Sequence, residues 1–285
     1  MNETITIIYE PNQRHKIGVF KMIGIMFTNI YHSKELILQL FIRDFFAIYK
    51  KSYFGIGWLV ITPLVAVISW VFMNKTGVLN PGDVGIPYPA YVLLSTSIWN
   101  LFKGYYVSAT ETLGAGAGFI MQVKYPHEVL LIKQTAQHLA GFFTGFIINI
   151  AVLLYFDITP SWKIIFLPFI SLPLFFLGAG LGLIVSVFKI VAEEIQKILD
   201  IFLNILIYLT PVIYSPNINN ILLQKILKYN PLTYLIGASR DIIIYGRFEN
   251  YKFEFLIAAL VSLSVFLFAW RIFFLTEEKV IEKMI

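Results

Sequence analysis

The chain has 285 residues, of which 58% are hydrophobic and only 14% are charged. Soluble domains carry about 25% charged residues, so the composition excludes an ordinary soluble protein and predicts a polytopic membrane protein. The net charge is +5, but the basic residues gather near the ends of apolar segments, where they face anionic lipid rather than nucleic acid. Because there is no cysteine, a disulfide framework and Cys-ligated metals are excluded.

Residues 1–56 are predicted to form a cytoplasmic tail and an amphipathic interfacial helix. The tail occupies residues 1 to about 30, and the helix follows at about 34–51. Glu35, Gln39 and Arg43 recur on its polar side. The opposite side is apolar and carries Leu36, Ile37, Leu40, Phe41, Phe45 and Ile48. This pattern is typical of a helix that lies flat in the headgroup region of a membrane.

Residues 57–285 are predicted to form an all-α transmembrane domain. Six apolar segments favour six spans, at about 57–73, 88–108, 129–156, 164–188, 198–214 and 255–275. Basic residues beside the first span predict that both termini are cytoplasmic. Glycines spaced four residues apart predict close helix packing in the third span (Gly141 and Gly145) and in the fourth (Gly178 and Gly182). A charged tail is expected after the sixth span, from residue 276 onward.

The stretch from Ile205 to Tyr245 begins as an apolar helix and is then interrupted by Pro211 and Pro216. Two short amphipathic segments follow, separated by Asn230-Pro231, and neither is long enough to span a bilayer. They predict two half-length helices in an outer cap at about 215–253. Two interpretations stay open: a re-entrant structure beside a water-filled pathway, or two interfacial surface helices.

Lys103 lies within the second predicted span. A lysine in this position is costly in lipid, so it either has a function or extends its ammonium group toward the membrane surface. Because Lys103 is close to the end of the span, the second interpretation is favoured.

Sequence motifs for catalysis are missing. There is no phosphate-binding loop, metalloprotease motif or esterase motif, and the four histidines lack metal-ligand spacing. The spans hold almost no carboxylates, which ion-coupled carriers require. The sequence therefore predicts a pore that is driven by something else, with no enzymatic activity or metal site of its own.

A series of short motifs resembles the permease subunits of polysaccharide-export ABC transporters. In order they are Arg43-Asp44, Tyr49-Lys50-Lys51-Ser52, Trp58–Leu64, Ile86–Pro89, Val123–Pro126, Gly178–Ser186, Pro211–Tyr214 and Asn230–Thr233. Two features depart from the family pattern: Val191–Glu194 stands where a Tyr-Arg-Asp turn is common, and His127 replaces a usual arginine.

The resemblance implies a homodimer that associates with two copies of an ATP-binding cassette subunit in the bacterial cytoplasmic (inner) membrane. ATP and Mg would be bound by that partner, and this chain would bind no cofactor. The implied cargo is a lipid-linked polysaccharide such as O-antigen, capsule or teichoic acid, which would pass through a channel at the dimer interface.

Four groups of residues are predicted to serve this export. The lipid pyrophosphate would enter near Arg43, Lys50 and Lys51. Sugars would stack on Trp58, Trp99, Tyr105, Tyr208 and Tyr214, unless these aromatics form lipid-facing belts or core. Coupling to the ATPase would use a charged segment, Lys124, Tyr125, Pro126, His127 and Glu128. An outer gate would use Pro211, Pro216, Asn230 and Pro231.

Two alternatives to polysaccharide export remain. The first is an ABC permease for a drug or lipid. The second is a membrane-embedded transferase acting on lipid-linked sugars, which would need paired carboxylates near the membrane edge. The sequence offers only isolated candidates of this kind, such as Asp44 and Asp157.

Overall fold

The computed structural model describes residues 17–50, 53–113, 128–189, 192–217 and 220–284, and all regular secondary structure in these ranges is helical. The prediction of an all-helical protein is confirmed. Among the described residues, three segments are long and apolar enough to cross a membrane: Glu128–Tyr155, Trp162–Lys189 and Lys252–Thr276. Val60–Lys75 is apolar but shorter. The count of six spans therefore stays a prediction.

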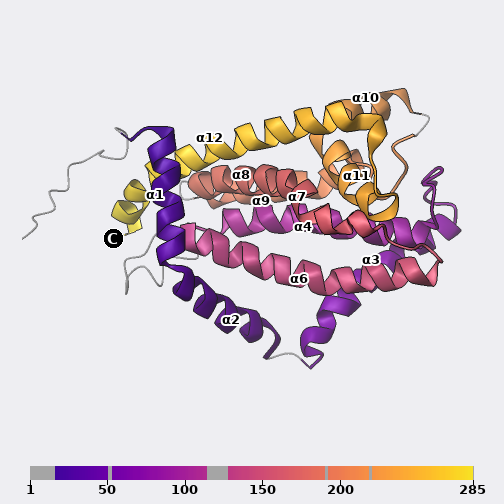
Figure 1. Ribbon diagram of the computed structural model, residues 1–285, viewed down its shortest axis with the longest axis horizontal. Helices are drawn as coiled ribbons and strands as arrows, with labels where there is room; N and C mark the ends of the chain where they lie inside the picture. Colours follow the sequence, from indigo (N-terminus) through magenta and orange to yellow (C-terminus); the bar gives the residue numbers. More distant parts are fainter. Residues whose placement is uncertain (1–16, 51–52, 114–127, 190–191, 218–219, 285) are drawn as a thin grey trace, which may run out of the picture.

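The helices follow the predicted order along the chain (Figure 1). The first half contains α1 (Val19–His32), α2 (Lys34–Lys50), α3 (Trp58–Lys75), α4 (Tyr88–Thr110) and α6 (Glu128–Tyr155). The second half contains α7 (Leu167–Ile170), α8 (Leu172–Lys189), α9 (Glu193–Leu206), α10 (Ile221–Tyr229), α11 (Pro231–Ile244) and α12 (Lys252–Met284). Short 3-10 turns precede α3, α7 and α12 and follow α9.

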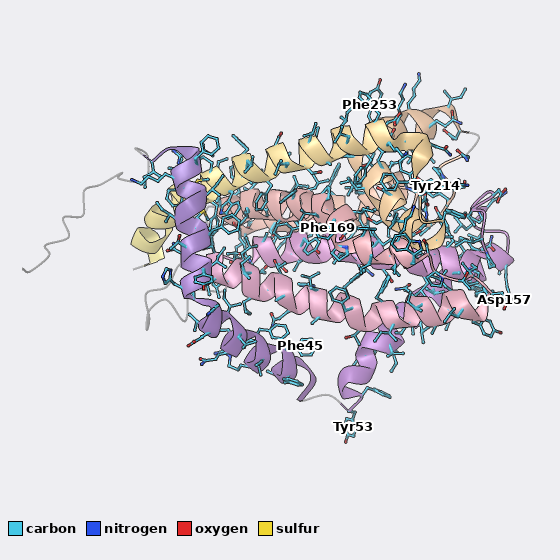
Figure 2. All side chains as sticks on the ribbon, viewed as in Figure 1. Phe45, Tyr53, Asp157, Phe169, Tyr214 and Phe253 are labelled. Atoms are coloured by element: carbon cyan, nitrogen blue, oxygen red, sulfur yellow. The ribbon has the colours of Figure 1, made fainter. Side chains whose placement is uncertain are left out.

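Helix α4 forms the centre of the bundle. It packs against α8 on one side and α6 on another, while α12 packs on α8 (Figure 1). Tyr91 and Phe102 of α4 are almost completely buried. We refer to the two ends of the bundle by residues: the Glu128 end, where α6 begins and α1 crosses, and the Asp157 end, where α10 and α11 lie (Figures 1 and 2).

Glycines on α8 allow α4 to approach closely. A β-carbon at Gly182 would lie 2.3 Å from the carbonyl oxygen of Tyr106, and one at Gly178 would lie 2.7 Å from that of Phe102. Close packing at this glycine pair is confirmed. At Gly145 of α6 an added β-carbon would meet nothing within 4 Å, so the expectation of close packing there is wrong within this chain.

Three helix boundaries differ from the sequence prediction. Residues 19–32, predicted as part of a tail, form α1, because Met22 and Met26 occupy one face and are buried beside α8 and α12. The fifth predicted span stops being helical at Leu209, since Pro211 cannot donate a backbone hydrogen bond. Helix α12 continues to Met284 through the predicted charged tail, whose Glu and Lys residues favour helix.

The glycine packing predicts the outcome of a matched pair of substitutions. Gly182→Ala should destabilise the protein by about 1–3 kcal/mol, because its new methyl group overlaps a backbone carbonyl that cannot move freely. Gly145→Ala should leave stability unchanged or slightly higher, because the site is open. Thermal unfolding of the two purified variants in detergent would measure the difference. Equal midpoints would contradict the close approach of α4 and α8.

Candidate functional site

A buried cation lies at the Asp157 end of the bundle, where α11 meets α4. Arg240 of α11 is 6% exposed. Its Nη1 donates to the Tyr91 hydroxyl at 2.7 Å, its guanidinium carbon lies 4.6 Å from the centre of the Tyr91 ring, and its Nε is 3.3 Å from Asp241 Oδ1. A buried arginine is tolerated when such partners surround it, so this group fixes α11 against α4.

Asp241 joins this group to the 3-10 turn that precedes α12. The hydroxyl of Tyr251 donates to Asp241 Oδ2. Burial raises the pKa of Tyr251, and the neighbouring Asp241 carboxylate raises it further. The phenol therefore stays protonated and available as a donor at neutral pH. Arg240, Asp241, Tyr91 and Tyr251 together are called the arginine network below.

The arginine network supports a stretch of chain that has left the helix. Residues 210–215 follow the last turn after α9 and are buried. The Tyr91 hydroxyl lies 3.0 Å from the carbonyl oxygen of Pro211 and 2.8 Å from that of Tyr214. The Tyr88 hydroxyl donates to the carbonyl of Ile213 at 3.0 Å. These side chains satisfy carbonyl groups that an unbroken helix would have satisfied internally.

Asn230 joins the same stretch to the beginning of α11. Its Nδ2 donates to the carbonyl of Leu209 at 2.8 Å and to Thr210 Oγ1 at 2.9 Å, while its Oδ1 accepts from the backbone N–H of Leu232. Pro231 is the first residue of α11, where a missing N–H costs nothing. Three of the four predicted gate residues, Pro211, Asn230 and Pro231, are buried or half-buried where this stretch meets α11. The fourth, Pro216, is exposed. Their role as a gate stays a prediction.

The predicted phosphate-entry residues lie on and after α2. Arg43 Nε is 2.6 Å from Asp44 Oδ1, and Lys133 Nζ of α6 is 2.9 Å from Asp44 Oδ2. Burial opposes ionisation of Asp44, but the hydrogen bonds from Arg43 and Lys133 outweigh it and lower its pKa. The sequence suggested that Asp44 is an isolated carboxylate. This expectation is wrong, because Asp44 is paired with Arg43 and Lys133. Lys50 ends α2, but its side chain, like all of Lys51, lies outside the described residues.

The predicted coupling segment is described only at its last residue, because Lys124, Tyr125, Pro126 and His127 lie outside the described residues. Glu128 is the first residue of α6 and is 2% exposed. Its Oε1 accepts a hydrogen bond from Asn29 Nδ2 of α1 at 2.8 Å. Glu128 thus joins α1 to the start of α6.

The five predicted channel aromatics fall into two groups. Trp99, Tyr105 and Tyr214 are only 3%, 5% and 6% exposed, whereas Trp58 and Tyr208 are 46% and 53% exposed. Tyr214 lies inside the bundle beside α11 (Figure 2) and donates to the carbonyl of Tyr208. The structure does not bring the five together on one surface of the chain, and their contact with sugar stays a prediction.

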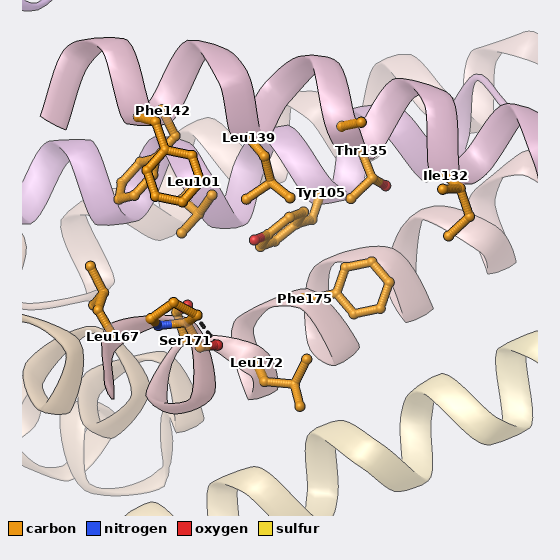
Figure 3. A pocket seen from close by; sticks show the side chains of 13 residues that line it. Leu101, Tyr105, Ile132, Thr135, Leu139, Phe142, Leu167, Ser171, Leu172 and Phe175 are labelled. Carbon is orange, nitrogen blue, oxygen red and sulfur yellow. Dashed lines mark hydrogen bonds between the residues drawn. The ribbon is translucent and has the colours of Figure 1, made fainter. Parts of the chain in front are cut away.

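Two cavities lie beside α6. One of about 420 Å³ is almost entirely apolar, and Tyr105 and Phe175 line it with their rings at right angles to each other (Figure 3). The second, of about 570 Å³, lies between α2, α3, α4 and α6 and has a mixed lining that includes Trp58, Asn100 and His138. The second cavity can therefore accept polar as well as apolar groups.

Comparison with known proteins identifies the family. The family model described as ABC-2 type transporter matches residues 35–244. The chain belongs to the ABC-2 type transporter family. Within this ABC-2 type transporter, the match runs from the second residue of α2 to the last residue of α11. It therefore includes the broken segment, Arg240 and Asp241, and the resemblance of the short motifs is confirmed.

Three relatives of this ABC-2 type transporter carry the name O-antigen export system permease protein RfbA. One from Klebsiella pneumoniae is 22% identical over 246 residues, which cover 84% of this chain and 93% of that protein. A second from the same organism is 22% identical over 227 residues, covering 79% and 86%. One from Myxococcus xanthus is 21% identical over 185 residues, covering 65% and 70%.

The arginine network was not predicted from the sequence. The helical spacing of the second short segment places Ser239, Arg240 and Asp241 off its apolar face, which is the side that usually faces away from a core. Ser239 and Arg240 are buried instead, because α11 packs inside the bundle and not on its surface. The adjacent Arg and Asp in a short, otherwise apolar segment were the available signal.

The burial of Arg240 predicts a large loss of stability on its removal. Arg240→Leu removes the cation that pairs with the partly buried Asp241 carboxylate, and should lower the free energy of unfolding by about 3–5 kcal/mol. Arg247→Leu is the matched control, since Arg247 is exposed, and should change it by at most about 0.5 kcal/mol. Denaturant unfolding in mixed detergent micelles would measure both. Similar values would contradict the structural role of Arg240.

Proposed function

We propose that this chain is the channel-forming subunit of an ATP-driven exporter that moves a lipid-linked polysaccharide across the bacterial cytoplasmic (inner) membrane. The observation that carries the proposal is the family match over residues 35–244, together with O-antigen export permeases that align with most of the chain. Because the sequence has no phosphate-binding loop, ATP and Mg would be bound by a separate subunit and this chain would not itself be an enzyme.

A homodimer is the form proposed for the channel. Helix α9 supports it with a row of exposed apolar side chains at helical spacing: Ile198, Ile201, Phe202 and Ile205. In a single chain at least half of each of these side chains stays exposed, and a second copy or lipid would cover the row. Two copies of an ATP-binding cassette subunit would complete the transporter, and both termini would lie in the cytoplasm.

Three groups of residues would serve export: a phosphate-entry group, exposed aromatics and an outer gate. The lipid pyrophosphate would meet Arg43, Lys50 and Lys51 at the inner headgroup level, where arginine and lysine bind phosphate well. Trp58 and Tyr208 would contact sugars directly, since they are exposed. Residues 210–217 with Asn230 would form the outer gate, because their backbone is held by side-chain hydrogen bonds rather than by a helix.

Coupling is proposed to pass through residues 124–128. Movement of the ATPase partner would displace this segment at the Glu128 end. The hydrogen bond between Glu128 and Asn29 would then carry the displacement to α1 as well as along α6. Residues 124–127 would contact the partner, while buried Glu128 would transmit the motion.

The composition of the native complex tests the proposed class. Mild-detergent purification of the tagged chain from its own membranes should recover an ATP-binding subunit in equal amount, as a two-plus-two complex measured by native mass spectrometry. If the chain is recovered alone, while another membrane complex in the same preparation stays intact, the proposed function is wrong. The partner-free transferase would then be the better hypothesis, tested by turnover of a lipid-linked sugar.

A second experiment tests coupling. Lys124→Glu should reduce export at least about tenfold, the effect of losing about 1.4 kcal/mol of coupling free energy, while the complex stays intact. Lys225→Glu changes the same charge on α10 at the other end of the bundle and should export normally. Cell-surface glycan would be quantified for both variants. Normal export by Lys124→Glu would rule out the coupling role.

A further inference from the structure

Two side-chain hydrogen bonds connect α4 to α9 at different depths. Near the Glu128 end, Gln196 Nε2 of α9 donates to Glu111 Oε1, just after α4, at 3.1 Å. Deeper in the bundle, Lys103 Nζ of α4 donates to Asn204 Oδ1 of α9 at 2.9 Å. Lys103 precedes Glu111 by eight residues, and Asn204 follows Gln196 by eight. At 1.5 Å per residue the two bonds are about 12 Å apart along each helix.

The Lys103 ammonium group is therefore held level with Asn204. The sequence favoured an extension of this side chain toward the membrane surface. The structure instead directs it sideways to α9, about 12 Å deeper than the Glu111 carboxylate. A cation at this depth is costly in lipid and persists where water or a counter-ion accompanies it.

Lys103 differs from Lys133 and Lys189 because its hydrogen-bond partner is neutral. Lys133 pairs with Asp44, and Lys189 binds both carboxylate oxygens of Glu111 at 2.9 Å. Among the residues that the structure describes, no carboxylate lies within 4.0 Å of Lys103 Nζ. Asp200, one turn from Asn204 on α9, makes no ion pair with it. The positive charge of Lys103 is therefore not neutralised within the described chain.

The face of α4 that carries Lys103 is partly exposed and has both polar and apolar side chains, among them Asn100 and Val107. Asn100 lies one turn earlier on this face, and Asn204 opposite it on α9 is also exposed. Asn100 borders the cavity of about 570 Å³, which also has Gln137 and His138 in its lining. The Gln137 Nε2 group is buried and has no hydrogen-bond acceptor within the described ranges. Asn100 thus stands between Lys103 and this cavity, while Lys103 and Asn204 are not among the residues that line it.

We propose that Lys103, with the amides of Asn204 and Asn100, forms a binding site for a phosphate ester at membrane depth. The inference rests on the proposed function, because a lipid-linked glycan brings phosphate into the membrane. A bound phosphate supplies the counter-ion that Lys103 lacks, and hydrogen bonds between ammonium and phosphate are charge-assisted. The phosphate comes either from the lipid carrier or from phosphodiester groups of the glycan. The site lies deeper than Arg43 and would receive the phosphate after entry.

Binding of polyprenyl phosphate to the full-length chain tests the site without requiring export or an ATPase partner. The protein would be placed in phosphatidylcholine nanodiscs and titrated with polyprenyl phosphate by native mass spectrometry. Lys103→Gln should weaken binding at least about tenfold, the usual effect of losing one charged hydrogen bond. Lys103→Arg should keep affinity within about threefold. Lys75→Gln is the control, since Lys75 is exposed at the end of α3, and should bind like the wild type.

Asn204→Asp provides an independent variant that keeps the size of the side chain. It places a carboxylate beside the Lys103 ammonium, so the internal ion pair should exclude phosphate and weaken binding as much as Lys103→Gln does. The site is rejected if either variant binds polyprenyl phosphate within about threefold of the wild type, or if Lys75→Gln weakens binding equally. If these variants support the site, glycerol 3-phosphate is added as a competitor. Displacement of polyprenyl phosphate by glycerol 3-phosphate indicates that the ligand is a glycan phosphate, and lack of displacement indicates the lipid carrier.

Failure of the exporter proposal and failure of the phosphate site give different results. A chain that purifies without an ATP-binding subunit overturns the exporter but does not affect the binding titration. A chain that purifies with this subunit, yet binds phosphate independently of Lys103, keeps the exporter and rejects the site.

Discussion

The need to satisfy the backbone carbonyl groups of residues 209–214 governs the arrangement of the Asp157 end. When α9 stops, these groups lose their helical donors, and neither lipid nor an apolar core can replace them. Donors come from Tyr88 and Tyr91 of α4 and from Asn230 at the start of α11. Arg240 then positions Tyr91 from the other side. Helix α11 must therefore fold back into the bundle, because its two ends carry these partners.

At the Glu128 end, polar pairs fasten elements that are far apart in sequence. Asp44 with Lys133 joins α2 to α6, Asn29 with Glu128 joins α1 to α6, and Glu111 with Lys189 joins the end of α4 to the end of α8. An ionised pair is cheapest where water is near, which suits the end proposed to meet the cytoplasmic partner. Lys103 lies deeper and has no such carboxylate, which is why it is the residue proposed to bind phosphate.

Local sequence patterns predicted some helices and one helix contact correctly. The helix at 34–51 and the third span were placed within about two residues, because amphipathic spacing and long apolar runs are properties of the local sequence. The prediction of close packing at the glycine pair on α8 was also correct, since small residues four apart lie on one helix face. The same reasoning failed for Gly145, because a small residue permits close packing but does not supply the neighbour.

Charged and aromatic residues were harder to place. Asp44 was expected to be isolated, and helical spacing places Arg240 off the apolar face of its segment. Each is nevertheless paired with a residue from another helix: Lys133 for the first and Tyr91 for the second. The predicted channel aromatics divide into buried and exposed groups for a similar reason. A tyrosine or tryptophan has the same local pattern in a core, at a lipid interface and in a channel, and only its neighbours distinguish these environments.

The sequence by itself determined that this is a helical membrane protein, where its helices are interrupted, and which family its motifs resemble. These features follow from composition, from proline and glycine chemistry, and from periodicity, which act over a few residues. Only the tertiary structure decided which carbonyl groups Tyr91 and Asn230 satisfy, that α11 is buried, and that Lys103 meets an amide rather than a carboxylate. Those outcomes depend on pairs such as Tyr91 and Arg240, 149 residues apart, whose meeting no local pattern encodes.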